Sequence, residues 1–138
     1  MPLSATDAAR KTKLAAAASP AIVNATPEDR AAFEAVLGRP IPDAVAADRD
    51  WILLYAADRS ALEAALPSVA RALASPGTLW IAYPKGSSRR QTDLTRDAGW
   101  DALRDTDLMW LSLVAIDDAW SAFSLRRYNP GEARQTFR

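Results

Sequence analysis

The sequence lacks cysteine and histidine altogether, although it is 138 residues long. Without cysteine the chain can form no disulfide bond, and it offers neither a thiol nucleophile nor a thiolate ligand for a metal. Without histidine it lacks the most common general base, which excludes a Ser-His-Asp or Cys-His arrangement. The most common zinc ligand is missing as well. Any catalysis would therefore depend on carboxylates, lysine, tyrosine, hydroxyl groups or a bound cofactor.

An excess of charge of one sign is also missing, because 17 basic residues balance 17 acidic residues. No overall field would therefore attract nucleic acid or an anionic membrane. No apolar run approaches the ~20 residues of a membrane-spanning helix. Residues 10–20 are basic and then apolar, as in a signal peptide, but the apolar part is short and mostly alanine. We expect a cytoplasmic protein that binds neither nucleic acid nor membranes.

The length and composition are those of one soluble globular domain. The chain is long enough for one hydrophobic core and short for two. Hydrophobic residues make up 49% and charged residues 25%, which is an ordinary balance. We expect a single domain over residues 1–138, with an ordered core at about 20–128, a mobile N-terminal segment and a polar C-terminal tail. Alanine-rich residues 8–18 could form a short helix at the domain edge.

Short apolar runs alternate with helical patterns along the chain. Strands are expected at residues 21–24, 41–47, 51–56 and 79–83, the second of them at an edge because of its prolines. Helices are expected to begin at Thr26-Pro27, at the capping box of Ser60 and near Thr92-Asp93, and to end at Gly38, at the turn 75–77 and near Arg104. Residues 110–116 and 120–128 are separated by so short a connector that they must form an antiparallel hairpin.

This order of elements indicates the fold class. Strands that alternate with helices imply right-handed crossovers and a mostly parallel sheet with helices on both faces. The hairpin adds an antiparallel strand at the C-terminal end. We therefore predict an α/β fold, namely a three-layer, doubly wound, mostly parallel sheet with an antiparallel C-terminal strand.

The loop after the strand at 79–83 is polar and basic. The carboxyl ends of parallel strands meet at one edge of a sheet, where open α/β proteins place their sites. Lys85, Ser87, Ser88, Arg89 and Arg90 precede the expected helix start, and together they could hold a phosphate or a carboxylate. An ordinary solvated loop with a helix cap explains the same residues and is the favoured interpretation. The loop lacks the Gly-Lys-Ser/Thr sequence of a phosphate-binding Walker loop.

The hairpin connector contains Asp117 and Asp118, which could bind magnesium or act as acid and base. Aspartates are also common in turns, because their side chains bond the turn backbone. Neighbouring residues on a strand point to opposite faces, so we favour a structural role in the turn. Of the five tryptophans, Trp100 and Trp120 could line a cleft or a subunit contact, although core packing is the favoured interpretation for all five.

The turn after the first strand, residues 24–29, contains no glycine. A dinucleotide or S-adenosylmethionine site normally needs a glycine-rich turn here, because side chains keep the ligand away from the backbone. We therefore expect no bound cofactor.

Several segments together resemble a family of small bacterial proteins of unknown function. They are Leu79–Lys85, Thr92–Asp97, Val114–Asp117 and Trp120-Ser121, within a resemblance that covers about residues 20–128. Pro84-Lys85 followed by Thr92–Asp97 is its most specific part. The family looks like a trimmed class I methyltransferase sheet, so the resemblance implies that topology, with the final strand inserted antiparallel. It also implies that certain residues belong together: Lys85, Thr92, Asp93, Arg96, Asp117, Trp120 and Ser121.

These observations predict a non-catalytic module that binds a protein partner or a small anionic ligand at the carboxyl edge of the sheet. The predicted site residues are Lys85, Ser87, Arg89, Thr92, Asp93, Asp117, Trp120 and Ser121, with no catalytic or metal-binding residue among them. The alternative is a divergent S-adenosylmethionine-dependent transferase, which only the topology suggests. A homodimer through a sheet edge or the last hairpin is a further hypothesis, since two-fold dimers are the commonest soluble assemblies.

Overall fold

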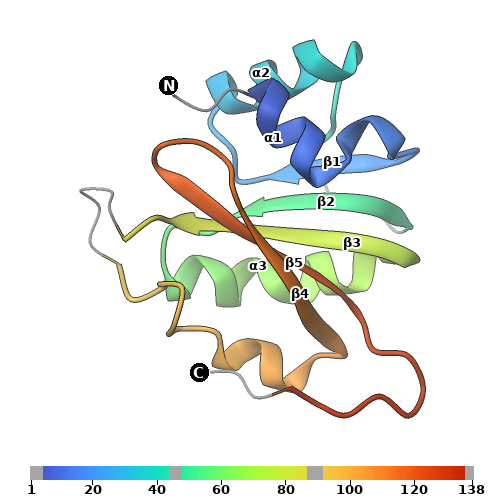
Figure 1. The fold of residues 1–138 in the computed structure, drawn as a ribbon, viewed down its shortest axis with the longest axis vertical. Helices are drawn as coiled ribbons and strands as arrows, with labels where there is room; N and C mark the ends of the chain where they lie inside the picture. Colours follow the sequence, from blue (N-terminus) through green and yellow to red (C-terminus); the bar gives the residue numbers. More distant parts are fainter. Residues whose placement is uncertain (1–4, 44–47, 87–91, 136–138) are drawn as a thin grey trace.

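The structure is a computed structural model, which describes residues 5–43, 48–86 and 92–135. One five-stranded sheet runs through the middle of the molecule, with helices on both of its faces (Figure 1). The α-helices are α1 (Ala5–Thr12), α2 (Pro27–Leu37) and α3 (Arg59–Ala72), and the 3-10 helices are η1 (Leu14–Ala16) and η2 (Asp101–Asp105). The strands are β1 (Pro20–Val23), β2 (Arg49–Tyr55), β3 (Leu73–Pro84), β4 (Leu108–Ala115) and β5 (Trp120–Arg127). None of the helices in these ranges is long and apolar enough to cross a membrane.

The strand order in the sheet is β1-β2-β3-β5-β4. The first three strands are parallel, and β5 lies between β3 and β4, antiparallel to both. This arrangement confirms the predicted α/β class, the mostly parallel sheet and the antiparallel C-terminal strand. It also fixes which side chains share a face. Across β3 and β5, Tyr83 pairs with Ser121 and Pro84 pairs with Trp120.

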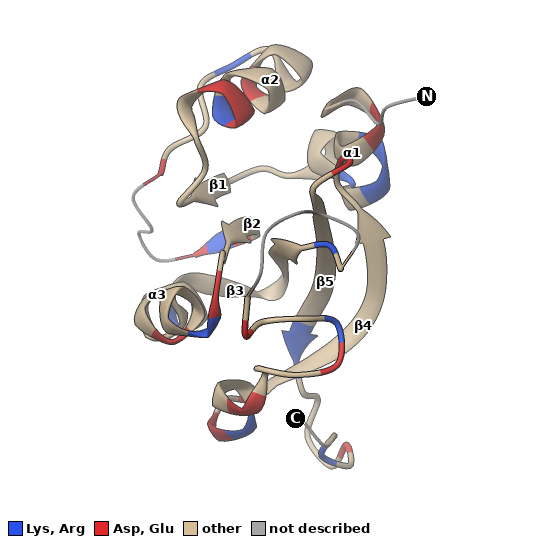
Figure 2. Ribbon diagram, turned by 90° about the vertical axis from the view of Figure 1, so that its left-hand side faces the viewer, with Lys and Arg blue, Asp and Glu red and all other residues tan. Residues whose placement is uncertain are grey.

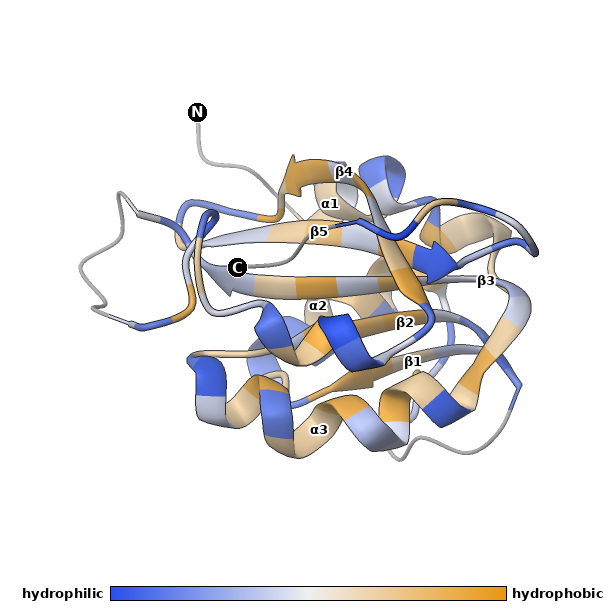
Figure 3. Cartoon of the chain, turned by 90° about the horizontal axis from the view of Figure 1, so that it is seen from below, coloured by the Kyte–Doolittle hydropathy of each residue, from blue (hydrophilic) through white to orange (hydrophobic). Residues whose placement is uncertain are grey.

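Two hydrophobic clusters fill the space between the sheet and the helices. Residues of α1, η1 and α2 pack on one face, against β-strand residues such as Trp51, Leu53 and Trp80. Residues of α3 and η2 pack on the other face, against Ile52 and Leu54. Neighbouring residues of β2 thus alternate between the two clusters, as the pleat of a strand requires. Figure 3, seen from the side of α3 and η2, shows hydrophobic residues along the middle of the strands.

The alanine-rich N-terminal segment forms helices that lie against the sheet. Residues 5–12 form α1, whose Ala8, Ala9 and Thr12 are buried. The short helix predicted within residues 8–18 is thus confirmed in part, although α1 begins earlier, at Ala5. Small side chains allow the helix to approach the sheet closely, and hydrophobic periodicity does not reveal such a contact because alanine contributes little to it.

Helix α2 follows its sequence signals closely. The Thr26 side chain accepts a hydrogen bond from the backbone N–H of Asp29 at 3.1 Å, and Pro27 occupies the first turn. At the other end Gly38 adopts φ 83°, in the left-handed region, and its N–H donates to the Glu34 carbonyl at 2.8 Å. Both end signals act within four residues along the chain, so the sequence alone predicts them.

Helix α3 begins earlier than the capping box at Ser60 predicts. Its N-cap is Asp58, whose side chain accepts from the backbone N–H of Ala61 at 2.8 Å. Glu63, the other member of the predicted box, instead lies 3.7 Å from the Arg59 guanidinium. An aspartate at the cap adds its negative charge to the amide groups of the helix start, which favours it over serine.

The edge strand predicted at residues 41–47 is not formed by residues 41–43, and the rest lies outside the described residues. Pro42 accepts one backbone bond, from the N–H of Ile22 in β1, at 3.0 Å. As a proline, it has no N–H to return. The Arg30 guanidinium replaces the missing ladder, since it donates to the carbonyls of Ile41 at 2.6 Å and Ile22 at 2.5 Å.

The turn predicted at residues 75–77 lies inside β3. Arg49 of β2 pairs with Leu73 and Trp51 pairs with Thr78, so residues 74–77 of β3 face only Asp50. These residues therefore bulge out of the ladder while the strand continues on both sides of them. The sequence therefore predicts the irregular backbone at residues 75–77 correctly. This irregularity lies within β3, however, and not between the end of α3 and the start of the strand.

The helix predicted from about Asp93 to Arg104 is wrong, because the described chain there has only η2 at its end. The Thr92 hydroxyl accepts from the N–H of Leu94 at 3.2 Å, which forms a local turn. Gly99 adopts φ 99°, and a Cβ atom there would lie 2.5 Å from the Asp93 carbonyl oxygen. The loop thus folds back on itself at Gly99. Trp100 then enters the core and is fully buried.

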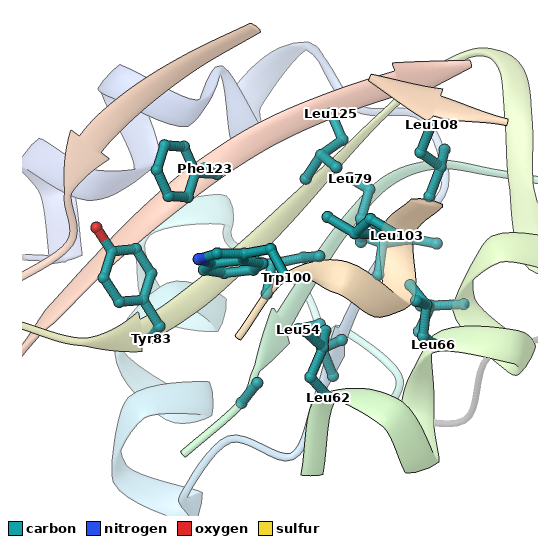
Figure 4. Packing of buried hydrophobic residues seen from close by; sticks show 14 of the residues in the cluster. Leu54, Leu62, Leu66, Leu79, Tyr83, Trp100, Leu103, Leu108, Phe123 and Leu125 are labelled. Atoms are coloured by element: carbon teal, nitrogen blue, oxygen red, sulfur yellow. The ribbon is translucent and has the colours of Figure 1, made fainter. Parts of the chain in front are cut away.

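The buried side chain of Trp100 stabilises residues 92–100 as a loop. Its indole Nε1 donates to the Thr95 carbonyl at 2.6 Å, and its ring lies edge-on to Tyr83, Trp110 and Phe123. Figure 4 shows the ring between Tyr83, Phe123 and the leucines of the same cluster. Burial of so large a ring favours the irregular backbone that carries it into the core, and helical propensity is only a weak bias against that backbone.

Candidate functional site

A cleft opens at the carboxyl end of β3. It has a volume of about 410 Å³ and is lined by Tyr83, Lys85, Gly86, Thr95, Arg96, Asp97, Leu113 and Ser121. Figure 2 looks onto the edge at which β1, β2 and β3 end, and shows the loop before η2 crossing in front of the sheet with residues of both charges. We call this cavity the Lys85 cleft. Three separate parts of the chain form it, namely the end of β3, the loop 95–97 and the hairpin β4–β5.

Tyr83 forms the inner wall of the Lys85 cleft. Its ring stacks on Phe123, with centroids 5.5 Å apart and planes inclined by 14°, and Ser121 hydrogen-bonds its hydroxyl. Burial raises the pKa of the Tyr83 phenol, whereas the charge of Arg96 and the bond to Ser121 lower it in part. The phenol is therefore neutral at pH 7, and it can both donate and accept a hydrogen bond.

Arg96 and Asp97 form the outer wall and pair with each other. The guanidinium Nε and Nη2 atoms lie 3.3 Å from the two carboxylate oxygens of Asp97. This hydrogen bonding raises the pKa of Arg96. The two side chains are 67% and 75% exposed, so water competes for both partners and the pair contributes little to stability. Arg96 can therefore exchange Asp97 for another carboxylate or a phosphate at small cost.

Thr92 and Asp93 lie outside the Lys85 cleft and hold its loop in place. The Thr92 hydroxyl donates to the Ala57 carbonyl at 2.7 Å, and the Asp93 carboxylate accepts from the N–H of Arg59 at 2.8 Å. Together with Asp58, Asp93 supplies the negative charge that the first amides of α3 attract. The predicted anion-binding helix start at Thr92 is therefore wrong, and the carboxylate at this edge belongs to the protein itself.

The Arg59 side chain strengthens the same connection. Its guanidinium donates to Asp101 of η2, so the start of α3 is joined to both ends of the loop. Thr92, Asp93 and Asp101 thus give the loop 92–101 three polar anchors on the end of β2 and the start of α3. The position of the outer wall of the cleft depends on these anchors.

Asp117 shapes the hairpin turn between β4 and β5. One of its carboxylate oxygens accepts from the backbone N–H groups of Ala119 at 2.8 Å and Trp120 at 2.9 Å. Trp120 lies on the face of the sheet opposite Ser121, where its ring is edge-on to Tyr55, with centroids 5.0 Å apart. The structure therefore separates Trp120 and Asp117 from the Lys85 cleft, as the turn interpretation of Asp117 requires.

Two of the predicted site residues, Lys85 and Ser121, come together in the cleft. Ser87 and Arg89 lie outside the described residues. Tyr83, Thr95 and Leu113 were not predicted from the sequence. Tyr83 could have been found because it is the last aromatic residue before the basic loop. Leu113 could not, since its place depends on the register of β4 against β5.

The arrangement of the strands agrees with that of known enzymes. The mitomycin 7-O-methyltransferase MmcR superposes with a TM-score of 0.53 at 11% identity, over 88% of this chain and 54% of its own length. The chain has a methyltransferase-like fold. A ribosomal protein L11 methylase from Lactobacillus delbrueckii subsp. bulgaricus gives a TM-score of 0.50 at 14% identity, over 91% and 79% of the two chains. No family model and no curated protein matches the sequence.

These likenesses establish the fold alone, because the identities are low. The predicted methyltransferase-like topology is confirmed, and the resemblance to a particular small bacterial family stays a prediction. The chain spans about half the length of MmcR, at 54%. Any activity must therefore be argued from the residues of this chain.

The carboxyl edge does not fit S-adenosylmethionine in the way that the fold suggests. Thr26 of the turn after β1 uses its side chain to cap α2, and Ala25 and Pro27 put further side chains where a glycine-rich turn would leave room. At the end of β2 the Tyr55 ring packs against Trp120, and burial, with Asp29 and Asp117 adding to it, raises the pKa of Tyr55. The protein's own side chains thus occupy this edge.

Proposed function

We propose that the chain binds a small anionic ligand in the Lys85 cleft and performs no chemistry on it. The observation that carries the proposal is the gathering of Lys85 and Arg96 with the hydroxyls of Tyr83, Thr95 and Ser121 in one cleft. These groups are all hydrogen-bond donors, and two of them are cations. A carboxylate or phosphate needs such donors to replace its hydration.

The exposed pair of Arg96 with Asp97 supports this proposal. The Asp97 carboxylate accepts from two nitrogens of the guanidinium, as a ligand carboxylate would in a bidentate pair. Because both side chains are mostly exposed, a ligand that also contacts Lys85 can compete with Asp97. Leu113, which is 43% exposed, offers an apolar contact for the remainder of the ligand.

The binding role is favoured over a catalytic one because of the state of Tyr83. Among the described residues that line the cleft, Tyr83 is the buried titratable group, and burial raises its pKa further from neutral. An efficient general acid or base has a pKa near the working pH. Tyr83 is therefore suited to hold a ligand by a hydrogen bond and is poorly suited to transfer its proton.

The experiment is a calorimetric titration of the protein with inorganic phosphate, nucleoside phosphates and small carboxylates. We expect saturable binding that falls by about 10- to 100-fold in Lys85→Ala and in Arg96→Ala, as expected for the loss of one charged hydrogen bond. Arg71→Ala, an exposed arginine in the last turn of α3, is the matched control and should bind like the unmodified protein. If the unmodified protein binds none of these anions, the proposal is wrong, and a protein partner becomes the better hypothesis.

A second candidate is an S-adenosylmethionine-dependent transferase, which the methyltransferase-like fold favours. The occupied edge at Thr26, Tyr55 and Trp120 disfavours it. A thermal-shift assay separates the two candidates, because a ligand that binds only the folded chain stabilises it by about 2.7 kcal/mol at ~100 times its dissociation constant. We expect no shift with S-adenosylmethionine. A clear rise in melting temperature would favour the transferase.

A further inference from the structure

A second cavity lies on the face of the sheet opposite Tyr83, between the segment α1–η1 and strands β3, β5 and β4. It has a volume of about 350 Å³. The residues of its lining that matter here are Lys11, Lys13, Trp80, Leu111, Ser112 and Ser124. A volume of this size is within the range of pockets that hold small molecules. We call it the Trp80 cavity.

Trp80 has an unusual place among the buried tryptophans. Trp51 donates its indole N–H to the Thr12 carbonyl at 2.8 Å, and Trp100 donates to Thr95 at 2.6 Å. Trp80 is only 5% exposed, and its Nε1 has no hydrogen-bond partner in the described part of the chain. An unpaired buried donor destabilises a fold, whereas phenylalanine would fill much of the same space without that cost. An acceptor supplied from outside would satisfy the Trp80 N–H.

A pair of serines lies beside Trp80. Ser124 pairs with Trp80 across β3 and β5, is 3% exposed, and has its Oγ 2.8 Å from the Ser112 Oγ. The Ser124 Oγ also accepts the N–H of Ser112 at 3.1 Å. Only one of the two hydroxyl hydrogens is needed for the bond between the serines. The other can be donated to a ligand, so the cavity has a second donor next to the indole.

The charges around the cavity favour an anion of low charge. Lys11, in the last turn of α1, and Lys13, just after that helix, contribute two ammonium groups. Asp50 also lines the cavity, but its carboxylate oxygens accept from the backbone N–H groups of Ala18 and Ser19 at 2.8 and 2.9 Å. A singly charged carboxylate is less costly to remove from water than a doubly charged phosphate. Leu111, which is 50% exposed, provides an apolar wall.

We propose that the Trp80 cavity binds a small organic carboxylate with an apolar tail. The carboxylate accepts from the Trp80 N–H and the serine pair, Lys11 and Lys13 balance its charge, and the tail packs against Leu111. This site is independent of the Lys85 cleft, because it lies on the other face of the sheet and shares no lining residue with it. The failure of one proposal therefore leaves the other standing.

The test is a titration with hexanoate, followed by calorimetry and by the five tryptophan indole N–H signals in ¹H–¹⁵N spectra. The Trp80 signal is assigned by its loss in Trp80→Phe. We expect that signal to shift with a saturable dependence on hexanoate. We expect methyl hexanoate, which lacks the charge, to bind about tenfold more weakly or worse, because it cannot form a charge-assisted hydrogen bond.

Two variants decide the role of the named residues. Trp80→Phe and Lys11→Ala should each weaken the binding of hexanoate at the Trp80 signal by about tenfold. Arg71→Ala, an exposed residue of α3 that lines neither cavity, should leave it unchanged. Lys11→Ala tests the site even if Trp80→Phe does not fold. A Trp80 signal that does not move, a shift without saturation, or equal affinity in Lys11→Ala would each overturn the proposal.

Discussion

Replacing Asp93 by alanine tests whether the loop beside the Lys85 cleft is anchored on the start of α3. The Asp93 carboxylate accepts from the backbone N–H of Arg59, the first residue of α3, at 2.8 Å. Asp93 lies 34 positions from Arg59 in the sequence, so this bond connects distant parts of the chain. The variant removes an acceptor and a negative charge from the helix start at once.

The expected loss of stability follows from these two contributions. Removing a capping acceptor costs about 0.5–2 kcal/mol, and a favourable charge in the first turn adds about 0.3–1 kcal/mol. The Arg59 N–H faces solvent, so water replaces part of the lost bond. The loss in the free energy of unfolding should therefore lie in the lower half of the summed range, at about 1 kcal/mol. This corresponds to a melting temperature lower by about 4 °C.

Urea unfolding of three variants measures this contribution. Asp93→Ala should lose about 1 kcal/mol, while Asp93→Asn, which keeps an acceptor and loses the charge, should recover about half of it. Asp118→Ala is the control, because Asp118 is an exposed aspartate in the hairpin turn. If Asp93→Ala unfolds at the same urea concentration as Asp118→Ala, the bond to Arg59 contributes nothing to stability and does not anchor the loop.

Two further predictions concern the core and the C-terminal segment. Trp100→Ala should lose about 3–5 kcal/mol in urea unfolding, because it empties a fully buried site, whereas Trp100→Phe should lose clearly less. Hydrogen bonds from Arg126, helped by the N–H of Asn129, lower the pKa of Glu132 to about 2, below its ordinary 4.5. The depressed pKa means that this pair stabilises the fold fully above about pH 4.5 and loses its effect as the pH falls toward 2. Urea unfolding at several pH values should therefore show a smaller loss between pH 4.5 and 2 in Glu132→Gln than in the unmodified chain, and equal losses would contradict the assignment.

The parts of the fold that were predicted depend on interactions that are local in the sequence. The cap at Thr26, the stop at Gly38 and the hairpin of β4 and β5 each involve residues close to one another along the chain. The apolar run of β2 was equally clear, because a strand that is covered on both faces shows no alternation. Such signals need no knowledge of what lies across the sheet.

The failures occur where one local motif serves a distant element. Thr92-Asp93 has the residues of a helix N-cap, and Asp93 does cap a helix, but the helix is α3. The burial of Trp100 decides between a helix and a loop, and no short-range signal shows it. Helix propensity therefore predicts the wrong structure for residues 92–104, although each residue there suits the contacts that it makes in the folded chain.

The candidate site was predicted in part for the same reason. Lys85 follows a strand, and its place at the carboxyl edge is a matter of topology. The pairing of Ser121 with Tyr83 requires the register of β5, which the sequence does not contain. The alternation of side chains along a strand places Trp120 and Ser121 on opposite faces, and the predicted site, which contains both residues, did not take this into account.

The position of β5 affects how the molecule can assemble during synthesis. Strand β4 pairs only with β5 among the described strands, and β5 comes later in the chain. In a nascent chain that ends before Trp120, the native partner of β4 has not yet been made. The sheet can be completed only when residues 120–127 are available, because β5 pairs with both β3 and β4. The Lys85 cleft, whose walls include Leu113 and Ser121, is therefore among the last features to form.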